Sequence, residues 1–364
     1  MKKREWLLLP AFLLLSCAPS PASEAPGAVK SPASTAASDA AATPLEARDA
    51  STDGAASTDG GDSVTTLSPF VGHDEAVDML FTAAADNTSP PSCAGDDAAA
   101  IHCLLHARYV DSAGDDLANG LAAALYDSTG DVVGVVKEHV MDGGYRGMLH
   151  LVPVFPTGAN RVHLTRVSNA LADYDRFFAE LQAKGNARVA YRWRALSLRF
   201  FRSVKARTPS AYASGWRVAY NVDGSLNKTG DSVRETMFHE IFHLNDSDHG
   251  AKGDDWADRA LESTYEDIHA SCRFNKSPTM CLEKFAPNDT MVKGGTYYAF
   301  QPGNDVREYA AELAVRYYKE QRGALGQGSA VKIPFKCTGK GNAAAWKKLV
   351  DEFFGAIDLT GACP

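Results

Sequence analysis

Residues 234–250, RETMFHEIFHLNDSDHG, are the stretch of this chain that most clearly indicates its fold and chemistry. They contain His239, Glu240 and His243 in the pattern His-Glu-x-x-His. Residues four apart lie on one face of a helix, so a helix here brings both imidazoles to one metal ion and leaves Glu240 beside it. Zinc binds neutral histidine nitrogen, and a neighbouring carboxylate can take a proton from an activated water. The motif predicts a hydrolytic site with one zinc ion per chain.

The residues around the motif support a buried helix. Apolar side chains recur at helical spacing, at Val233, Met237, Ile241 and Leu244. The alternative is a solvated helix that carries two surface histidines. Phe238 and Phe242, which flank the histidines directly, favour the metal site over that alternative.

Two histidines need a third protein ligand, and the sequence offers two candidates. His249 stands where the metzincin pattern places its third histidine, but Asp246 occupies the position of the glycine that lets the chain turn out of the helix. The other candidate is Glu308, which lies four residues before Glu312 and therefore on the same helical face. An exposed pair of acids, matched with Arg307, Arg316 or Lys319, is the alternative for that face.

The two elements together resemble a known family. His-Glu-Ile-Phe-His-Leu-Asn-Asp, followed by Glu-Tyr-Ala-Ala-Glu, is similar to the metal-site elements of anthrax-toxin lethal-factor-like zinc peptidases, which are gluzincins. The resemblance covers only these two helices. It implies that His239, His243 and Glu308 bind zinc and that Glu240 is the general base.

The same resemblance implies roles for residues around the ligands. Glu312 would hydrogen-bond a ligand histidine and fix its tautomer, while Asp246 matches in position, with a structural or ligand-supporting role. A tyrosine hydroxyl faces the oxyanion in this family, and Tyr298 or Tyr297 could supply it. Their spacing differs from the family pattern, so a core tyrosine is the alternative; Tyr298 is the predicted catalytic residue.

Residues 1–16 are typical of a secretion signal. Lys2, Lys3 and Arg4 precede an apolar run at 6–15, which is shorter than the ~20 residues that a bilayer requires. The run ends in Leu14-Leu15-Ser16-Cys17, which resembles the lipobox of bacterial lipoproteins, in which the cysteine carries the lipid. An ordinary secretory signal is the alternative. We therefore expect a bacterial cell-envelope protein, anchored by lipid and favouring the outer membrane, or a secreted one.

Composition divides the rest of the chain. Residues 17–66 are rich in Ala, Ser, Thr, Pro and Gly and predict a disordered tether. Residues 67–364 then form the metallopeptidase-like domain, with a helical and sheet part at 67–230 and the metal-site helices and C-terminal helix at 231–364. The substrate is expected to be a peptide or protein; the oligomeric state is not indicated.

Cysteine usage fits an oxidising compartment, because six of the seven cysteines, all but Cys17, make an even number that can form disulfides. No Cys-x-x-Cys motif occurs, so a thiolate zinc site is not expected. Besides Cys17 the cysteines fall in sequence-local pairs. The simplest pairing is Cys93–Cys103, Cys272–Cys281 and Cys337–Cys363, although six cysteines allow fifteen arrangements.

The formal net charge is −8, which gives no sign of general nucleic-acid binding. One stretch, residues 184–207, is basic and contains no acidic residue. A solvated or internally paired face is the favoured interpretation of this stretch, and a site for an acidic partner is the alternative.

The pattern of apolar residues predicts an α+β fold. Helices are expected at 74–85, 96–108, 115–126, 168–184, 256–270, 305–320 and 342–357, besides the motif helix. Strands are expected at 131–140, 146–154 and 216–220, and residues 187–204 are buried as helix or strand. This combination indicates a mostly helical, zincin-like catalytic domain with a small mixed or antiparallel sheet.

The strand expected before the motif helix could line the substrate cleft. In zinc peptidases an edge strand at this place commonly lines the cleft and pairs with an extended substrate. Residues 215–221 are the candidate here, and an interior strand is the alternative. The predicted function is zinc-dependent peptide hydrolysis. A non-catalytic lipoprotein with a structural zinc site, or a zinc hydrolase acting on other substrates, remains open.

Overall fold

The computed structural model describes residues 71–84, 88–95, 97–143, 147–251, 253–292 and 295–363. Residues Val64–Pro364 form one compact unit with a hydrophobic core of its own. A unit of this size with its own core has what it needs to fold by itself. The signal at 1–16, Cys17 and the tether at 17–66 lie outside the described residues.

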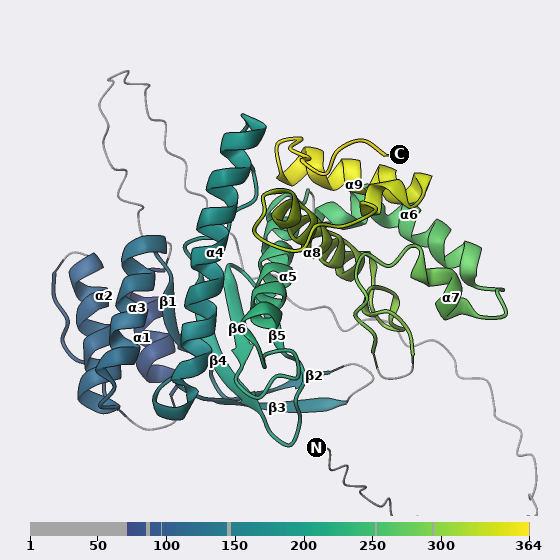
Figure 1. Ribbon diagram of the computed structural model, residues 1–364. Helices are drawn as coiled ribbons and strands as arrows, with labels where there is room; N and C mark the ends of the chain where they lie inside the picture. Colours follow the sequence, from purple (N-terminus) through teal and green to yellow (C-terminus); the bar gives the residue numbers. More distant parts are fainter. Residues whose placement is uncertain are drawn as a thin grey trace, which may run out of the picture. The chain divides into compact units, whose positions relative to one another are not determined.

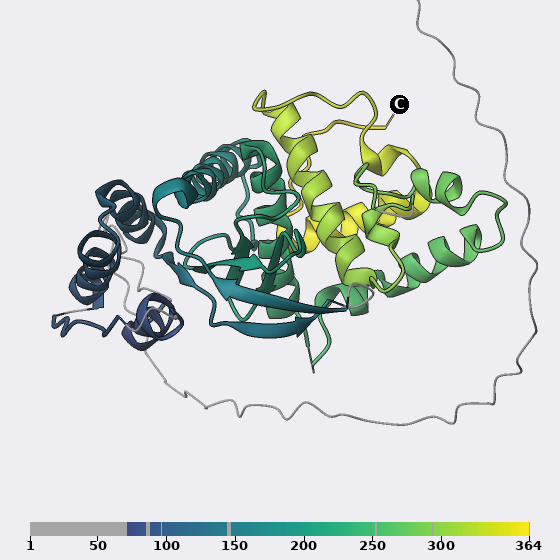
Figure 2. The same cartoon turned by 90° about the horizontal axis from the view of Figure 1, so that it is seen from below.

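The chain is a mixture of helices and one sheet, so the predicted α+β class is confirmed (Figure 1). The N-terminal helical elements gather at one end. They are α1 (His73–Val77), η1 (Asp78–Thr82), α2 (Asp97–His106), η2 (Ala107–Ser112) and α3 (Asp116–Thr129). Those at the other end are α6 (Trp256–Cys272), α7 (Pro278–Glu283), α8 (Val306–Ala324) and α9 (Lys340–Phe353). The sheet, with α4 (Arg161–Gly185) and α5 (Gly230–Asp248), lies between them (Figure 2).

The described residues form a six-stranded mixed sheet. Its strands are β1 (Val132–Val135), β2 (His139–Asp142), β3 (Met148–Pro153), β4 (Ser197–Ser203), β5 (Ala211–Ser214) and β6 (Arg217–Asn221). The order is β2-β3-β4-β6-β5, and β1 pairs with β4. Both β1 and β6 run parallel to β4, while the β2–β3, β3–β4 and β5–β6 pairs are antiparallel.

Two strand predictions need correction in detail. The run predicted as one strand at 131–140 forms both β1 and β2, because β1 pairs with the first half of β4 and β2 turns away to form a hairpin with β3. Residues 187–204, left open as helix or strand, end in β4. Long-range pairing decides these points, and local pattern does not encode it.

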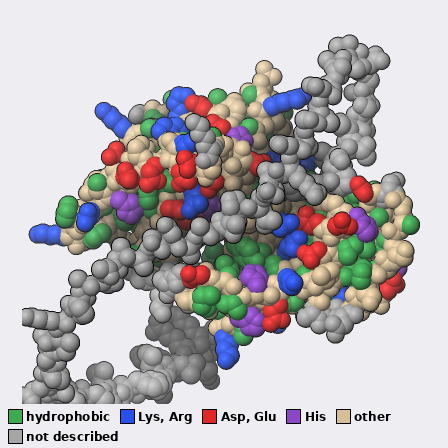
Figure 3. Space-filling model, turned by 180° about the vertical axis from the view of Figure 1, so that it is seen from behind, with side chains coloured by type: hydrophobic (Ala, Val, Ile, Leu, Met, Phe, Trp, Pro, Cys, Tyr) green, Lys and Arg blue, Asp and Glu red, His purple; other side chains and the backbone are tan. Residues whose placement is uncertain are grey.

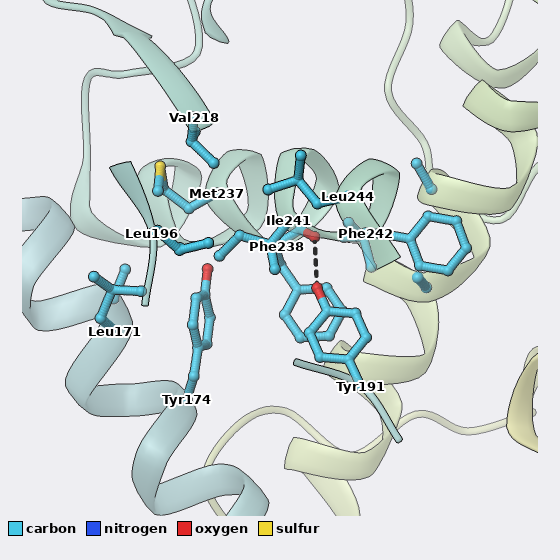
Figure 4. Close-up of a cluster of buried hydrophobic side chains, with 14 of the residues drawn as sticks. Leu171, Tyr174, Tyr191, Leu196, Val218, Met237, Phe238, Ile241, Phe242 and Leu244 are labelled. Carbon is cyan, nitrogen blue, oxygen red and sulfur yellow. Dashed lines mark hydrogen bonds between the residues drawn. The ribbon is translucent and has the colours of Figure 1, made fainter. Parts of the chain in front are cut away.

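One face of the sheet packs against α4 and α5. Leu198 and Phe200 of β4, opposite Val218 and Tyr220 of β6, lie in the same core as these two helices. Figure 4 shows α5 in this core, where the hydroxyl of Tyr191 donates to the carbonyl of Phe238 at 3.0 Å. This packing fixes the position and rotation of α5.

A strand does form at 217–221, but the hypothesis that it is an edge strand is wrong, because β6 lies inside the sheet between β4 and β5, which was the alternative. The edge strand is β5. Gly215 and Trp216 form the two-residue turn between them with φ of 56° and 57°, as turns of a tight hairpin require. The indole of Trp216 donates to Asp248 at 3.0 Å and lies 3.6 Å from the guanidinium of Arg192, which ties this turn to the end of α5.

Three disulfides join Cys93–Cys103, Cys272–Cys281 and Cys337–Cys363, which is the sequence-local pairing. Disulfides persist in oxidising compartments, so they indicate a location outside the cytoplasm. Among the described residues, no helix combines the length and apolar character that crossing a bilayer requires.

The basic stretch at 184–207 contains several internal ion pairs. Arg194 pairs with Asp175 at 2.6 Å, and Arg199 pairs with Glu75 at 2.9 Å. These arginines hold β4 and the segment before it to α4 and α1. The favoured interpretation of an internally paired face fits these contacts.

Candidate metal centre

Helix α5 carries the His-Glu-x-x-His residues, and its N-terminus is stabilised by a capping box. Thr229 caps the helix, accepting from the backbone N–H of Ser232 at 3.1 Å, and the Ser232 hydroxyl accepts from the Thr229 N–H in return. This reciprocal capping box satisfies two orphan donors at the helix start. His239 and Glu240 are each only 8% exposed, yet both line a cleft.

Helix α8 brings the second half of the site. Asp305 caps its start by accepting from the Arg307 N–H at 3.0 Å. Glu308 lies in the first turn, where the helix dipole favours a negative charge. Glu312 follows one turn later on the same face. The cations that could have neutralised these acids have other partners: Arg307 pairs with Asp305 and Asp255, Arg316 with Glu320, and Lys319 with Glu235.

The two helices bring His239, His243 and Glu308 together into a group that could hold a metal ion. The Nε2 atoms of the two histidines are 3.2 Å apart, and Nε2 of His239 is 3.1 Å from Oε2 of Glu308. His243 Nε2 lies 3.8 Å from Oε1 of Glu308. Donors bound tetrahedrally at about 2.0–2.1 Å lie about 3.3–3.4 Å apart, so the three side chains fit a zinc-sized ion. The group resembles a His-Glu-x-x-His…Glu zinc site.

Burial and charge oppose one another in the group. Burial raises the pKa of Glu308, but the hydrogen bonds of His239 and His243 outweigh it and hold that pKa well below its usual range. Burial lowers the pKa of His239, and the carboxylates of Glu308 and Glu312 more than reverse this. For Glu240, burial dominates and raises the pKa. Positive charge is therefore favoured between these side chains, which is what a bound cation supplies.

Glu312 lies behind His239. Its Oε1 is 3.3 Å from Nδ1 of His239, on the ring edge opposite the one that faces Glu308. A carboxylate there fixes the tautomer that leaves Nε2 free for a metal. Glu312 is 7% exposed and is held in turn by Asn288, whose amide donates to its Oε2 at 3.1 Å and to its backbone carbonyl at 2.7 Å.

Asn288 was not predicted from the sequence. It lies in the loop between α7 and α8 and has no motif around it. Only its placement under Glu312 gives it a role, and no local sequence signal could have revealed that placement.

Asp246 joins α5 to α6, and the charge of the nearby His243 acts on its carboxyl group. Its Oδ1 accepts from the backbone N–H of Ala257 in the first turn of α6, at 2.7 Å. Burial raises the pKa of Asp246 to about 7, although the Ala257 hydrogen bond opposes the rise. The hydrogen bond to Ala257 fits the structural role, and the proximity of His243 leaves the ligand-supporting role open.

The cleft beside the group has a volume of about 490 Å³. One wall is β5 with residues 209–215, and the other is the start of α8 with residues 303–305. Tyr298 also lines it, with its ring 5.8 Å from that of His239. Burial raises the pKa of Tyr298, and the negative charges of Glu308 and Glu240 add to this. Tyr297 packs against the hydrophobic core instead.

His249 is not brought into the group. Its Nδ1 lies 2.8 Å from Oε1 of Glu352 in α9, and its ring packs on Phe353 at 4.7 Å. Helix α5 ends at Asp248, so the chain turns away before His249 could point back to the other histidines.

Comparison with known proteins gives no family. No family model, no curated protein and no solved structure matches this chain. The geometry of the site therefore carries the functional argument alone.

Proposed function

We propose that this protein is a zinc-dependent metallopeptidase of the gluzincin type. The observation that carries the proposal is the set of three donors from α5 and α8, at the spacing of a tetrahedral zinc site, beside an open cleft that Glu240 also lines. His239, His243 and Glu308 would hold the ion.

Zinc bound there supplies a Lewis acid that lowers the pKa of water and polarises a carbonyl group. Glu240, which lines the cleft next to His239, would accept the proton of the attacking water. Glu240 would then return this proton to the leaving amine. Tyr298, which also lines the cleft, would stabilise the oxyanion through its hydroxyl.

The shape of the cleft supports an extended peptide as substrate. β5 is an edge strand, and its free edge can pair with another strand. On the cleft side this strand contributes the small side chains of Ala211, Ala213 and Ser214 beside the larger one of Tyr212. The substrate would lie between this edge and residues 303–305.

A purely structural zinc site is less well supported. Structural sites are closed by four protein ligands. Among the described residues the metal group has three members, and His249 points elsewhere. A position on the ion would therefore stay open towards the cleft.

The test combines metal analysis with a peptidase assay on residues 64–364. The expected result is one zinc per chain and hydrolysis of unfolded protein or peptide libraries that a chelator abolishes and zinc restores. Stoichiometric zinc with no hydrolysis of any peptide, ester or amide substrate would favour the structural alternative. Absence of tight zinc binding would contradict the proposal of a zinc-dependent peptidase.

Anchoring is a separate part of the proposal. Cys17 follows a lipobox-like sequence, and the disulfides agree with an envelope location. Labelling with a fatty-acid analogue in a bacterial host should mark the full chain and not its Cys17→Ser variant. Equal labelling of both would place the lipid at a residue other than Cys17, and no labelling of the full chain would leave a secreted enzyme.

A further inference from the structure

The connection between α6 and α7 forms a closed loop at one end of the protein. Cys272, the last residue of α6, is bonded to Cys281 in α7, and residues 273–280 lie between them. We call these residues the stapled tip. The side chain of Thr279 donates to the carbonyl of Gly295 at 2.8 Å, which fixes the loop further.

The stapled tip exposes two large apolar side chains. Phe274 is 89% exposed and Met280 is 72% exposed. A single exposed apolar residue is ordinary, but here two occur within one short, cross-linked loop. Loop stabilisation does not explain them, because the disulfide and the backbone hold the loop without their help.

Basic residues accompany these apolar ones. Arg273 and Lys276 lie in the stapled tip, which contains no acidic residue, although the whole chain carries a net charge of −8. The guanidinium of Arg273 is 5.5 Å from the centre of the Phe274 ring. In Figure 3, hydrophobic and basic side chains lie side by side at the end of the molecule that α6 and α7 form.

We propose that the stapled tip docks on an anionic phospholipid surface. Phe274 and Met280 would enter the interfacial region of the bilayer, and Arg273 and Lys276 would meet lipid phosphates. A protein partner fits less well, because a stable interface buries about 800 Å² on each side and this tip is a short loop. The disulfide reduces the ordering cost of docking, since the loop is already closed.

Docking would also orient the proposed active site. Helix α6 has 17 residues and starts beside Asp255, which lines the cleft, so it is about 25 Å long. The tip at its far end would hold the cleft at about this distance from the lipid surface. The docking itself does not depend on peptidase activity, and its test needs no substrate.

The experiment measures binding of residues 64–364 to vesicles of phosphatidylglycerol and phosphatidylcholine in equal amounts, with pure phosphatidylcholine vesicles for comparison. This part of the chain lacks the signal and Cys17, so neither contributes. We expect sedimentation with the anionic vesicles only. Replacing both Phe274→Ser and Met280→Ser should weaken binding about tenfold or more.

Two further variants make the test specific. Val140→Ser with Met148→Ser removes two apolar side chains of similar exposure from the β2–β3 hairpin and should leave binding unchanged. Arg273→Gln with Lys276→Gln should weaken binding about tenfold and reduce its salt dependence. A Trp at position 274 (Phe274→Trp) should be quenched by brominated lipid beyond the background of the other tryptophans.

Several results would overturn the proposal. These are no binding of the unaltered chain to anionic vesicles, the same loss in the hairpin control, or no added quenching in Phe274→Trp. Self-association that Phe274→Ser abolishes, with no vesicle binding, would assign the tip to a second copy of the chain instead.

Discussion

The Nε2 atom of His239 lies 3.1 Å from Oε2 of Glu308, although 69 positions separate the two residues in the chain. The contact exists because α5 and α8 pack along each other through buried faces, with Phe238 stacked on Tyr318 at 4.5 Å between ring centres. A core of aromatic side chains thus sets the distance between two ionisable groups.

Glu240→Gln should retain zinc and lose peptide hydrolysis by roughly 10²–10⁴-fold, because the amide cannot accept the proton of water. The matched control is Glu235→Gln on the same helix, where an exposed carboxylate pairs with Lys319. It should keep full activity. Zinc content by mass spectrometry and a peptide assay test this. Unchanged turnover in Glu240→Gln would show that Glu240 is not the general base.

Glu308→Ala should weaken zinc binding strongly, because only the two imidazoles would remain of the three donors. His249→Ala should bind zinc as tightly as the unaltered chain, since His249 faces Glu352. Competition with a fluorescent chelator measures both affinities. If His249→Ala loses the metal and Glu308→Ala keeps it, the third ligand is His249.

Asn288→Asp should weaken zinc binding about 10–100-fold without unfolding the protein. The substitution keeps the size of the side chain but replaces the amide that donates to Glu312 with a carboxylate that repels it. Glu312 would then hold His239 less firmly. Zinc affinity and thermal unfolding of the metal-free protein are measured together. A loss of stability with unchanged affinity would restrict Asn288 to a structural role.

Asp358→Asn should cost about 1–2 kcal/mol of unfolding free energy at neutral pH. Burial raises the pKa of Asp358, but hydrogen bonds from Lys336, Thr360 and Trp346 lower it to about 2, against an ordinary value of 3.8. A lowered folded-state pKa stabilises the protein above pH 3.8, and this contribution disappears as the pH falls through 2. Urea unfolding between pH 2 and 7 should therefore show a gap between the two proteins that closes towards pH 2. A gap independent of pH would contradict the assignment.

Local sequence was sufficient for some features of this protein. The apolar spacing around residues 234–250 predicted a buried helix, and α5 is buried on the face that carries Met237 and Ile241. Helical periodicity likewise located α3, α6, α8 and α9 to within a few residues. These signals succeed because helix geometry places residues three and four apart on one face, whatever lies around them.

Other features were decided by contacts between distant segments. The identity of the edge strand depends on how β4, β5 and β6 pair, and a strand pattern is the same inside a sheet and at its edge. Asn288 has no signal of its own and gains a role only where it meets Glu312. The position of His249 depends on where α5 ends and on α9, which lies a hundred residues later.

By itself, then, the sequence determined the donors that α5 could offer, because the spacing of His239, Glu240 and His243 is a property of one helix. It also supplied Glu308 and Glu312 as a pair on one face of α8. Only the tertiary structure decided that these two helix faces pack together, with Nε2 of His239 3.1 Å from Oε2 of Glu308. It also decided that His249 faces Glu352. The physical reason is that side-chain periodicity is fixed within a few residues, whereas the approach of two helices depends on how the whole core packs.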